Sequence, residues 1–324
     1  MTLKDWTDYW MEVYDKPNVR RTTYEARRYI FQNHIIPGLG NIALTELTED
    51  EVGRFLEDRK HHGNHRPESK SYPEMSDESM LHLHRLLRQC LSQAVRDGLI
   101  EKNPADAFRY PKTMTVKANV LTAMEAENYM DAAEELDCLP MFNLALMTGL
   151  RQRELIALKW SDLDATKRIL TIYKGRVVER CELVDYEDTK RKIQLPKETV
   201  ALLKQEHLRH PGSPYMFQHP GTQKPYSPNM VRLLHNRIIE RSGLEDHIRF
   251  MDLRHTFAVL TLREGVELPA LTETLGLVRR YMTKKNYEAY LPGNGQNAPV
   301  SGKCTQYGED LRQAADKLEN LLNF

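Results

Sequence analysis

The sequence predicts a mainly α-helical protein with a small antiparallel β-sheet, organised as a helical first domain and a mixed second domain. Three observations support this prediction. Apolar residues recur at helical spacing from residue 4 to about 108, a polar segment occupies 110–120, and strand-like patterns are confined to 168–196. The length of 324 residues is sufficient for two domains.

The composition is that of an ordinary soluble protein, with 40% hydrophobic residues, 28% charged residues and a formal net charge of zero. No apolar run approaches the roughly 18 residues of a membrane span, and the N-terminus lacks the apolar core of a signal peptide. We therefore expect a cytoplasmic protein with no membrane partner. The zero net charge counts mildly against a nucleic-acid partner, but phosphate contacts depend on local patches.

The cysteines do not form a recognisable metal or disulfide pattern. Four cysteines are spread along the chain, and no two of them stand in a CxxC arrangement. The sequence therefore predicts neither a zinc site nor a disulfide framework.

The first domain, 1–109, is predicted to contain four or five helices. The first covers the apolar pattern of 3–13. Threonines followed three residues later by glutamate, at Thr22 and Thr48, predict two capping boxes and hence two helix starts. The proline-glycine segment 36–40, which contains Pro37, predicts the end of the helix that begins at Thr22.

A polar segment at 60–77 is expected to be an exposed loop in the first domain. The apolar stripe that follows predicts a long helix over 79–95. The proline and small polar residues of 110–120 indicate a linker between the domains.

The second domain, 121–292, is predicted to be mostly helical around one small antiparallel sheet. Thr122 is suited to cap a helix, and Pro140 is suited to open one. Three segments have strand patterns, namely 169–173, 177–178 and 193–195. Helix resumes at 199.

The most informative motif is the stretch 148–155, with sequence TGLRQREL, which carries Arg151. A second arginine, Arg254, lies about a hundred residues later in the stretch 252–256, with sequence DLRHT. A Leu-Gly pair at 275–276 precedes a segment rich in tyrosine. The order and spacing of these pieces resemble the active site of the tyrosine recombinases, the phage integrase family.

The resemblance extends over almost the whole chain. Segments 33–40 and 93–104 resemble the core-binding domain of integrases, and the tyrosine region is closest in pattern to the integrases of conjugative transposons. The resemblance implies a helical core-binding domain and a mixed α/β catalytic domain that form a C-shaped clamp around double-stranded DNA. The sequence starts directly at the core-binding domain, so we expect a short or a truncated member of the family.

The chemistry that the resemblance implies is attack of a tyrosine hydroxyl on a DNA phosphodiester, which leaves a 3′-phosphotyrosyl link and a free 5′ hydroxyl. Because the link conserves bond energy, neither a cofactor nor a metal is expected. Arginine suits the charge that develops on the phosphate, because its planar guanidinium bonds two oxygens. Arg151 and Arg254 match the two catalytic arginines, and Tyr287 matches the nucleophile, with Tyr290 and then Tyr281 as rivals.

Four further residues match positions of the family near these groups. Lys190 is the best candidate for the family's β-hairpin lysine. The hairpin turn is shorter here than is usual in the family, so Lys192 is a competing candidate. Glu154 matches an acidic position that orients a helix or an arginine. Asp252 is interpreted as a structural acid, and His255 as a donor of a supporting hydrogen bond.

Two positions depart from the family pattern. Met251 stands where members usually carry histidine or lysine, and Leu277 stands where they usually carry histidine or tryptophan. Neither side chain can exchange a proton, and loss of an acid–base group typically costs ~10²–10⁴ in rate. The site is therefore expected to be weakened, with His247 as a conceivable substitute.

Basic and hydroxyl-bearing residues of the first domain are candidates for DNA contacts. A cluster near a helix start comprises Arg20, Arg21, Thr22, Tyr24, Arg27 and Arg28, and the long helix carries Arg85, Arg88 and Arg96. We expect about half of them to be solvated charges with no contact to DNA.

The C-terminal segment 293–324 combines a Gly- and Pro-containing loop with an apolar stripe at helical spacing over 311–322. In the family, a terminal helix docks into a neighbouring protomer of a synaptic tetramer. A long loop is unnecessary for local packing, so we expect a homo-oligomer formed through this helix.

The leading interpretation is a site-specific DNA recombinase that integrates and excises a mobile element. Two alternatives stay open. Met251 and Leu277 favour a catalytically weak or inert DNA-binding relative that regulates recombination. A type IB topoisomerase shares the tyrosine chemistry, but it works as a monomer, and the apolar C-terminal helix argues against it.

Overall fold

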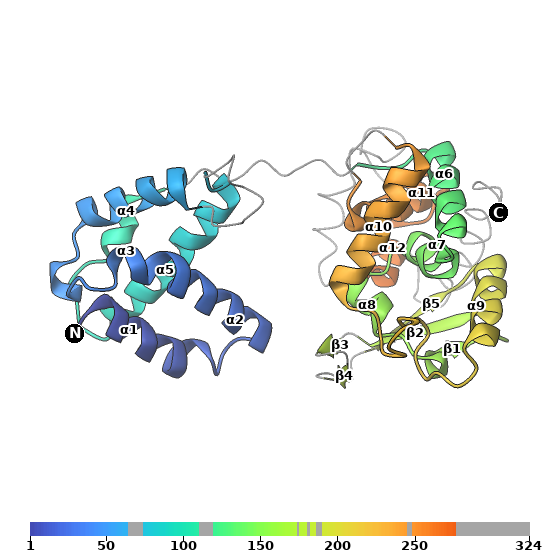
Figure 1. Cartoon of the computed structure of the whole chain (residues 1–324), viewed down its shortest axis with the longest axis horizontal. Helices are drawn as coiled ribbons and strands as arrows, with labels where there is room; N and C mark the ends of the chain where they lie inside the picture. Colours follow the sequence, from blue (N-terminus) through green and yellow to red (C-terminus); the bar gives the residue numbers. More distant parts are fainter. Residues whose placement is uncertain are drawn as a thin grey trace. The chain divides into compact units, whose positions relative to one another are not determined.

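The computed structural model describes residues 1–63, 74–109, 119–173, 175–179, 182–185, 190–244 and 248–276. The chain divides into two compact units, Met1–Val116 and Lys117–Phe324, and the division falls inside the segment predicted to be a linker. Figure 1 shows a helical first unit and a second unit in which helices accompany short strands. The predicted fold class is thus confirmed.

The first unit is built from helices around one apolar core. The α-helices are α1 (Leu3–Trp10), α2 (Arg21–Ile30), α3 (Ile36–Leu39), α4 (Glu49–His62) and α5 (Asp77–Arg96). The apolar stripe of α5 is fully buried, as predicted, and packs in a cluster with Trp6, Trp10 and Phe31. This packing holds α1, and the turn at Phe31 that follows α2, against the long helix.

The two capping boxes predicted in this unit have different outcomes. At Thr48 the box is present: the Glu51 amide donates to the threonine Oγ1 at 3.3 Å, and the Thr48 amide donates to the glutamate at 2.9 Å. The prediction at Thr22 is wrong, because α2 begins one residue earlier, after an extended Arg20, and has no side-chain cap. Thr22 therefore lies within the first turn of α2.

The helix end predicted in the proline-glycine segment 36–40 is found at Leu39, with Gly40 as the C-cap. A π-helical turn over Phe31–Ile35 follows α2, with the Ile36 amide bonded to the Phe31 carbonyl, and α3 continues to Leu39. Pro37 is tolerated because it lies in the first turn of α3, where no amide donor is needed. The loop predicted at 60–77 starts later than expected, since α4 extends to His62; residues 64–73 lie outside the described residues.

The second unit surrounds a mostly apolar helix, α7 (Leu139–Thr148). Its helices are α6 (Ala123–Glu135), α7 (Leu139–Thr148), α8 (Gln152–Ile156), α9 (Lys197–Arg209), α10 (Pro228–Ser242), α11 (Phe250–Arg263) and α12 (Leu268–Thr274). Thr122 caps α6 with Glu125, and Pro140 lies in the first turn of α7, as predicted. Every residue of α7 from Met141 to Thr148 is buried.

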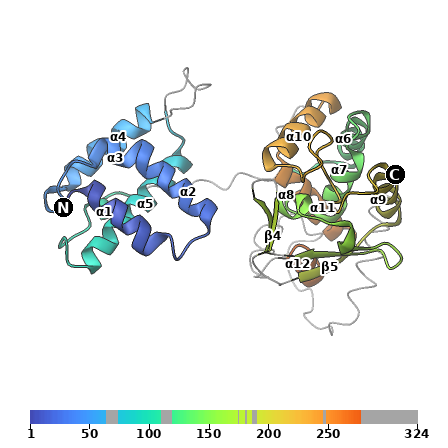
Figure 2. The same cartoon turned by 60° about the horizontal axis from the view of Figure 1, so that its bottom comes forward.

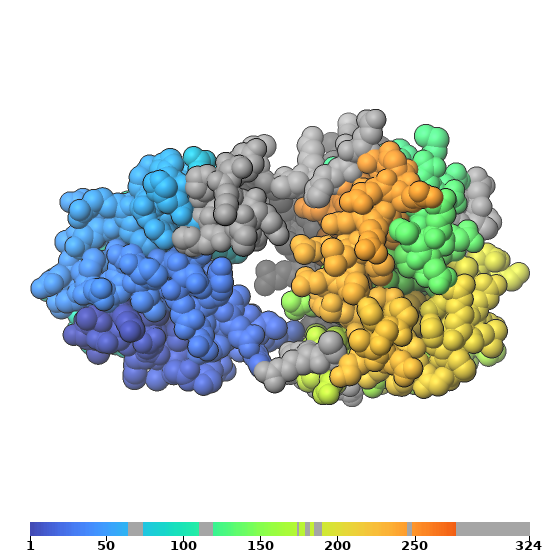
Figure 3. Space-filling view, viewed as in Figure 1, coloured from blue at the N-terminus to red at the C-terminus, as the bar shows by residue number. Residues whose placement is uncertain are grey.

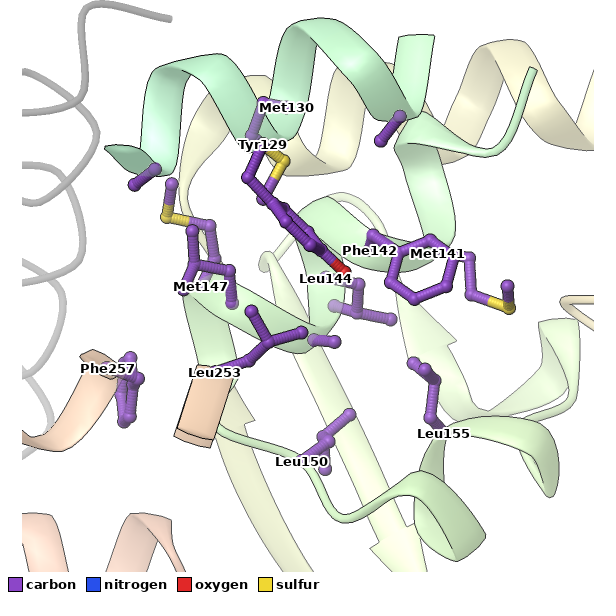
Figure 4. Close-up of a cluster of buried hydrophobic side chains, with 14 of the residues drawn as sticks. Tyr129, Met130, Met141, Phe142, Leu144, Met147, Leu150, Leu155, Leu253 and Phe257 are labelled. Atoms are coloured by element: carbon purple, nitrogen blue, oxygen red, sulfur yellow. The ribbon is translucent and has the colours of Figure 1, made fainter. Parts of the chain in front are cut away.

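Figure 4 shows how this core is assembled. Tyr129 on α6 and Phe142 on α7 lie in an edge-to-face contact with ring centroids 6.1 Å apart, and Leu253 of α11 reaches the same cluster. In the view of Figure 3, α6, α9 and α10 form the outer surface of the unit. The ends of α7 and α11 are consequently fixed by packing from several sides.

The strands form two small antiparallel sheets, where the sequence predicted one. β1 (Leu163–Asp164), β2 (Ile169–Tyr173) and β5 (Lys190–Gln194) form a sheet in the order β1-β2-β5. β3 (Arg176–Glu179) and β4 (Glu182–Asp185) form a separate hairpin, because the chain after β2 pairs with itself before β5 returns to β2. Figure 2 shows α12 next to β5, which it contacts.

Among the described residues, no helix is both long and apolar enough to cross a bilayer. The predicted C-terminal helix over 311–322 lies outside the described residues.

Candidate active site

The first part of the candidate site is the turn between α7 and α8. Gly149 ends α7 in the left-handed conformation, with φ of 61°, and a Cβ there would lie 2.7 Å from Cδ1 of Phe257. Glycine is therefore required by both the backbone and the packing. The chain then extends through Arg151, the N-cap residue of α8, whose side chain is 39% exposed.

Glu154 is the carboxylate next to Arg151. Its Oε2 accepts from the Arg151 amide at 2.9 Å, and its Oε1 accepts from the Arg151 guanidinium at 3.2 Å. Burial raises the pKa of Glu154, but the hydrogen bonds and charge of Arg191, together with the Arg151 amide, outweigh it and hold this pKa below its ordinary value. Glu154 is thus an ionised group that bonds both Arg151 and Arg191.

Arg191 is the residue that the sequence analysis missed. Its Nη1 and Nη2 donate to the two oxygens of Glu154 at 2.8 and 3.0 Å, and its Nε donates to the Thr274 carbonyl at 2.9 Å. The available signal was strand alternation: Arg191 lies on the same face of β5 as the buried Ile193. An arginine on the buried face of a strand requires a partner.

Arg254 lies in the interior, with 5% of its surface exposed. Its Nη1 donates to the Gly149 carbonyl at 2.7 Å, and its Nη2 donates to the Leu275 carbonyl at 2.6 Å. The guanidinium thereby joins the C-terminal ends of α7 and α12. It lies next to the turn that leads to Arg151, so the structure brings the two predicted arginines into one region.

Lys190 and Lys192 lie on β5 itself, whereas the sequence placed Lys190 at the hairpin turn. Lys190 is opposite Tyr173 of β2, and its Nζ is 6.0 Å from the centre of that ring. Both lysines are on the exposed face, opposite Arg191. Shared orientation leaves both as candidates, and residues 186–189 lie outside the described part of the chain.

The residues around Arg254 on α11 have separate surroundings. Asp252 is fully buried and accepts from the Arg249 guanidinium at 2.8 Å, in agreement with a structural role. Burial lowers the pKa of His255, so its imidazole is neutral near pH 7. Met251 is 44% exposed and is not a member of the buried cluster.

Tyr281, Tyr287 and Tyr290 lie outside the described residues, as do Leu277 and His247. The described residues end at Gly276, which follows the two carbonyls held by Arg191 and Arg254.

The predicted DNA-contacting residues of the first unit lie on α2 and α5, except for Arg20, which directly precedes α2. Several are engaged by nearby polar groups: Arg21 with Glu25, Tyr24 with Glu12, Arg27 with Asp15, Arg88 with Asp106, and Arg96 with Gln93. Arg20, Thr22, Arg28 and Arg85 are exposed. Arg27 and Arg85 both line a groove of about 900 Å³ between α2 and the start of α5.

Groups of at least three histidine, cysteine, aspartate or glutamate side chains that could hold a metal ion are absent among the described residues.

Comparison with known protein families identifies the family to which the chain belongs. The sequence profile described as Phage integrase family matches residues 119–292, which is more than half of the chain. A second profile, Phage integrase, N-terminal SAM-like domain, matches residues 2–58. The chain belongs to the phage integrase family. The resemblance noted in the sequence is thereby confirmed.

Relatives of this phage integrase family member include tyrosine recombinases. It is 24% identical over 261 residues to a "Tyrosine recombinase XerC-like" protein of Caldanaerobacter subterraneus subsp. tengcongensis, covering 69% of this chain and 65% of that protein. It is also 24% identical over 285 residues to the "ICEBs1 integrase" of Bacillus subtilis, covering 82% of this chain and 72% of the relative. The chain thus spans slightly less than two thirds of the first relative.

Solved structures of integrases share the fold of this family member. A lambda integrase dimer bound to a COC′ core site has a TM-score of 0.71 at 20% identity, covering 93% of this chain and 100% of the other. The Tn1549 transposon integrase in complex with a circular intermediate DNA has a TM-score of 0.74 at 18% identity, covering 93% and 96%.

Proposed function

We propose that the chain is a site-specific DNA recombinase that integrates or excises a mobile element through a 3′-phosphotyrosine intermediate. The observation that carries this proposal is the contact network between Arg254, the Arg151 turn, Glu154 and the segment ending at Gly276. In a phage integrase family member, this network joins the two motif arginines to the chain that leads to Tyr287. Double-stranded DNA is the proposed substrate.

The proposed roles follow from the chemistry of each group. Arg151 and Arg254 stabilise the negative charge that develops on the non-bridging phosphate oxygens. Tyr287 gives up its phenolic proton to water and attacks phosphorus, the bond from phosphorus to the 5′ oxygen breaks, and Lys190 or Lys192 donates a proton to that leaving oxygen. No metal or nucleotide cofactor has a role in this scheme. Glu154, Asp252 and His255 orient the groups that contact DNA.

The test is relaxation of a supercoiled plasmid in EDTA, with SDS-resistant protein–DNA adduct measured in the same samples. Tyr287→Phe removes the proposed nucleophile, and Tyr290→Phe is the matched control. Adduct and relaxation that disappear only in Tyr287→Phe would support the proposal. Adduct that disappears only in Tyr290→Phe would identify Tyr290 as the nucleophile in place of Tyr287.

The second candidate function is that of a catalytically inert DNA-binding relative. It is favoured by Met251, which stands exposed at the position where family members usually carry histidine or lysine. A thioether at this position cannot exchange a proton with the reacting groups. Absence of adduct in the wild type, despite measurable DNA binding and a substrate carrying the element's ends, would favour this candidate. Met251→His should then restore adduct formation if the missing imidazole is the defect.

We further propose that the C-terminal helix over 311–322 docks into a second protomer. Its apolar stripe and the preceding Gly- and Pro-containing loop support exchange between copies. Removal of residues 293–324 should abolish recombination. Full plasmid relaxation by the shortened chain as a monomer would favour a type IB topoisomerase.

A further inference from the structure

Arg191, on β5, contacts two other segments of the second unit. Its two terminal nitrogens bond both oxygens of Glu154, which starts α8, and its Nε bonds the Thr274 carbonyl at the end of α12. Only 13% of the Arg191 side chain and 8% of the Glu154 side chain are exposed. This is a bidentate, largely buried ion pair, the geometry in which arginine and carboxylate interact most strongly.

The segment after α12 is closely fitted to this arginine. Gly276 has φ of 61°, and a Cβ on it would lie 2.8 Å from Nη1 of Arg191. The backbone therefore passes directly against the guanidinium, at a distance that only glycine allows. Arg254 bonds the intervening Leu275 carbonyl, so two guanidinium groups hold three consecutive residues, 274–276.

Arg191 is also the main counter-charge of Glu154, the carboxylate next to Arg151. Glu154 bonds both arginines, but its contacts with Arg191 are the shorter and the bidentate ones, whereas its side-chain contact with Arg151 is single and 3.2 Å long. Without Arg191, a buried carboxylate would lose its main counter-charge. It would then hold the Arg151 guanidinium more tightly and repel a phosphate placed next to it.

We propose that Arg191 is a positioning residue for DNA cleavage, which neutralises Glu154 so that Arg151 is available to the phosphate and which fixes the turn at 274–276 from which the tyrosine segment departs. This inference rests on the proposed recombinase function. Arg191 does not contact DNA in this scheme. It acts through Arg151 and through the backbone that leads to Tyr287.

The experiment measures the rate of adduct formation as a function of plasmid concentration for the full chain and for Arg191→Lys and Arg191→Met. Lysine retains the charge but cannot bond both oxygens of Glu154 and the Thr274 carbonyl at once. The control is Thr199→Val, which removes a buried hydrogen bond to Asn143 of 2.8 Å in the same unit. The melting temperature of every variant is measured in parallel.

Displacement of a catalytic group by about 1 Å can cost about a hundredfold in rate, so we expect the saturated rate to fall by about tenfold to a hundredfold in Arg191→Met. Arg191→Lys should recover part of this loss. The plasmid concentration at half-maximal rate should change little. Thr199→Val, with a comparable loss of melting temperature, should retain the wild-type rate.

Three outcomes would overturn the inference, and they are distinguishable. Equal saturated rates in wild type and both Arg191 variants would show that Arg191 does not position the site. A rate loss in the Arg191 variants that equals the loss in Thr199→Val, at equal melting temperatures, would show that Arg191 has only a structural role in its ion pair. Absence of adduct in the wild type would overturn the proposed function itself, and the inference with it.

Discussion

In the helical unit, Arg85 and Arg88 lie exposed on α5, whereas in the mixed unit Arg191 and Arg254 are largely or fully buried. The exposed Arg88 bonds a surface carboxylate, Asp106, an arrangement that typically contributes about 0–1 kcal/mol. The buried pair instead bonds backbone carbonyls and a buried glutamate.

The difference indicates two uses of the same side chain. An exposed arginine can exchange a carboxylate for a phosphate without disturbing the fold, which suits contacts with the backbone of DNA. A buried arginine is held in one orientation by several acceptors, which suits stabilisation of a transition state. Substitutions should therefore affect stability and catalysis together in the mixed unit, but affinity alone in the helical unit.

The largest effect is expected for Arg254→Lys. A single ammonium group cannot reach the carbonyls of both Gly149 and Leu275, and one buried acceptor left unpaired costs about 1–3 kcal/mol. Adduct formation should fall by about 10²–10³ if this arginine stabilises the phosphate. Plasmid cleavage and thermal unfolding measure the two effects, with the exposed Arg263→Lys of the same helix as control. Wild-type cleavage in Arg254→Lys would contradict the buried-arginine interpretation.

Two left-handed glycines provide the next test, on stability. Gly149 of the mixed unit has φ of 61° and lies against Phe257, whereas Gly98 of the helical unit has φ of 72° and no atom near its missing Cβ. Alanine should cost about 1–2 kcal/mol of backbone strain at either position. At Gly149, overpacking should add about 1–3 kcal/mol. Calorimetry of both variants should find the larger loss for Gly149→Ala, and equal losses would contradict the close packing of the site.

Glu154→Gln should produce a smaller effect that depends on pH. The folded-state pKa of Glu154 lies below the ordinary value of 4.5, so the unfolded chain takes up the proton first as pH falls. Its stabilising contribution is therefore complete above about pH 4.5 and is lost as pH falls through the folded-state pKa. The stability difference between wild type and Glu154→Gln should narrow in acid. Urea titrations between pH 3 and pH 7 measure it, and the exposed Glu135→Gln serves as control. A constant difference would argue against ionised Glu154.

The smallest effect on stability is expected for Arg85→Ala. This arginine is exposed on α5 and lines the groove next to α2. Its removal should leave the melting temperature unchanged. The slope of the logarithm of the DNA-binding constant against the logarithm of the salt concentration should fall by the amount that corresponds to about one phosphate contact. Binding titrations at several salt concentrations measure this slope, and Lys4→Ala, an exposed cation on α1, is the control. Equal slopes for Arg85→Ala and wild type would remove Arg85 from the DNA contacts.

Features that depend on neighbouring residues were predictable from the sequence. The capping boxes at Thr48 and Thr122 and the buried stripe of α5 were predicted correctly, because three or four residues of local chain specify them. The prediction at Thr22 failed because α2 begins earlier, after an extended Arg20, and the threonine–glutamate spacing alone does not fix a helix start. The family motif also identified Arg151, Glu154 and Arg254 as a group.

The sequence by itself determined the fold class, the family and the residues of the two arginine motifs, since each is encoded in a short pattern or in the order of such patterns. Only the tertiary structure decided which groups meet. Arg191 bonds a glutamate that is 37 residues away, and Arg254 bonds a carbonyl that is 105 residues away. Contacts of this separation arise from the packing of α7, α11, α12 and β5 around one core, and no local pattern specifies them.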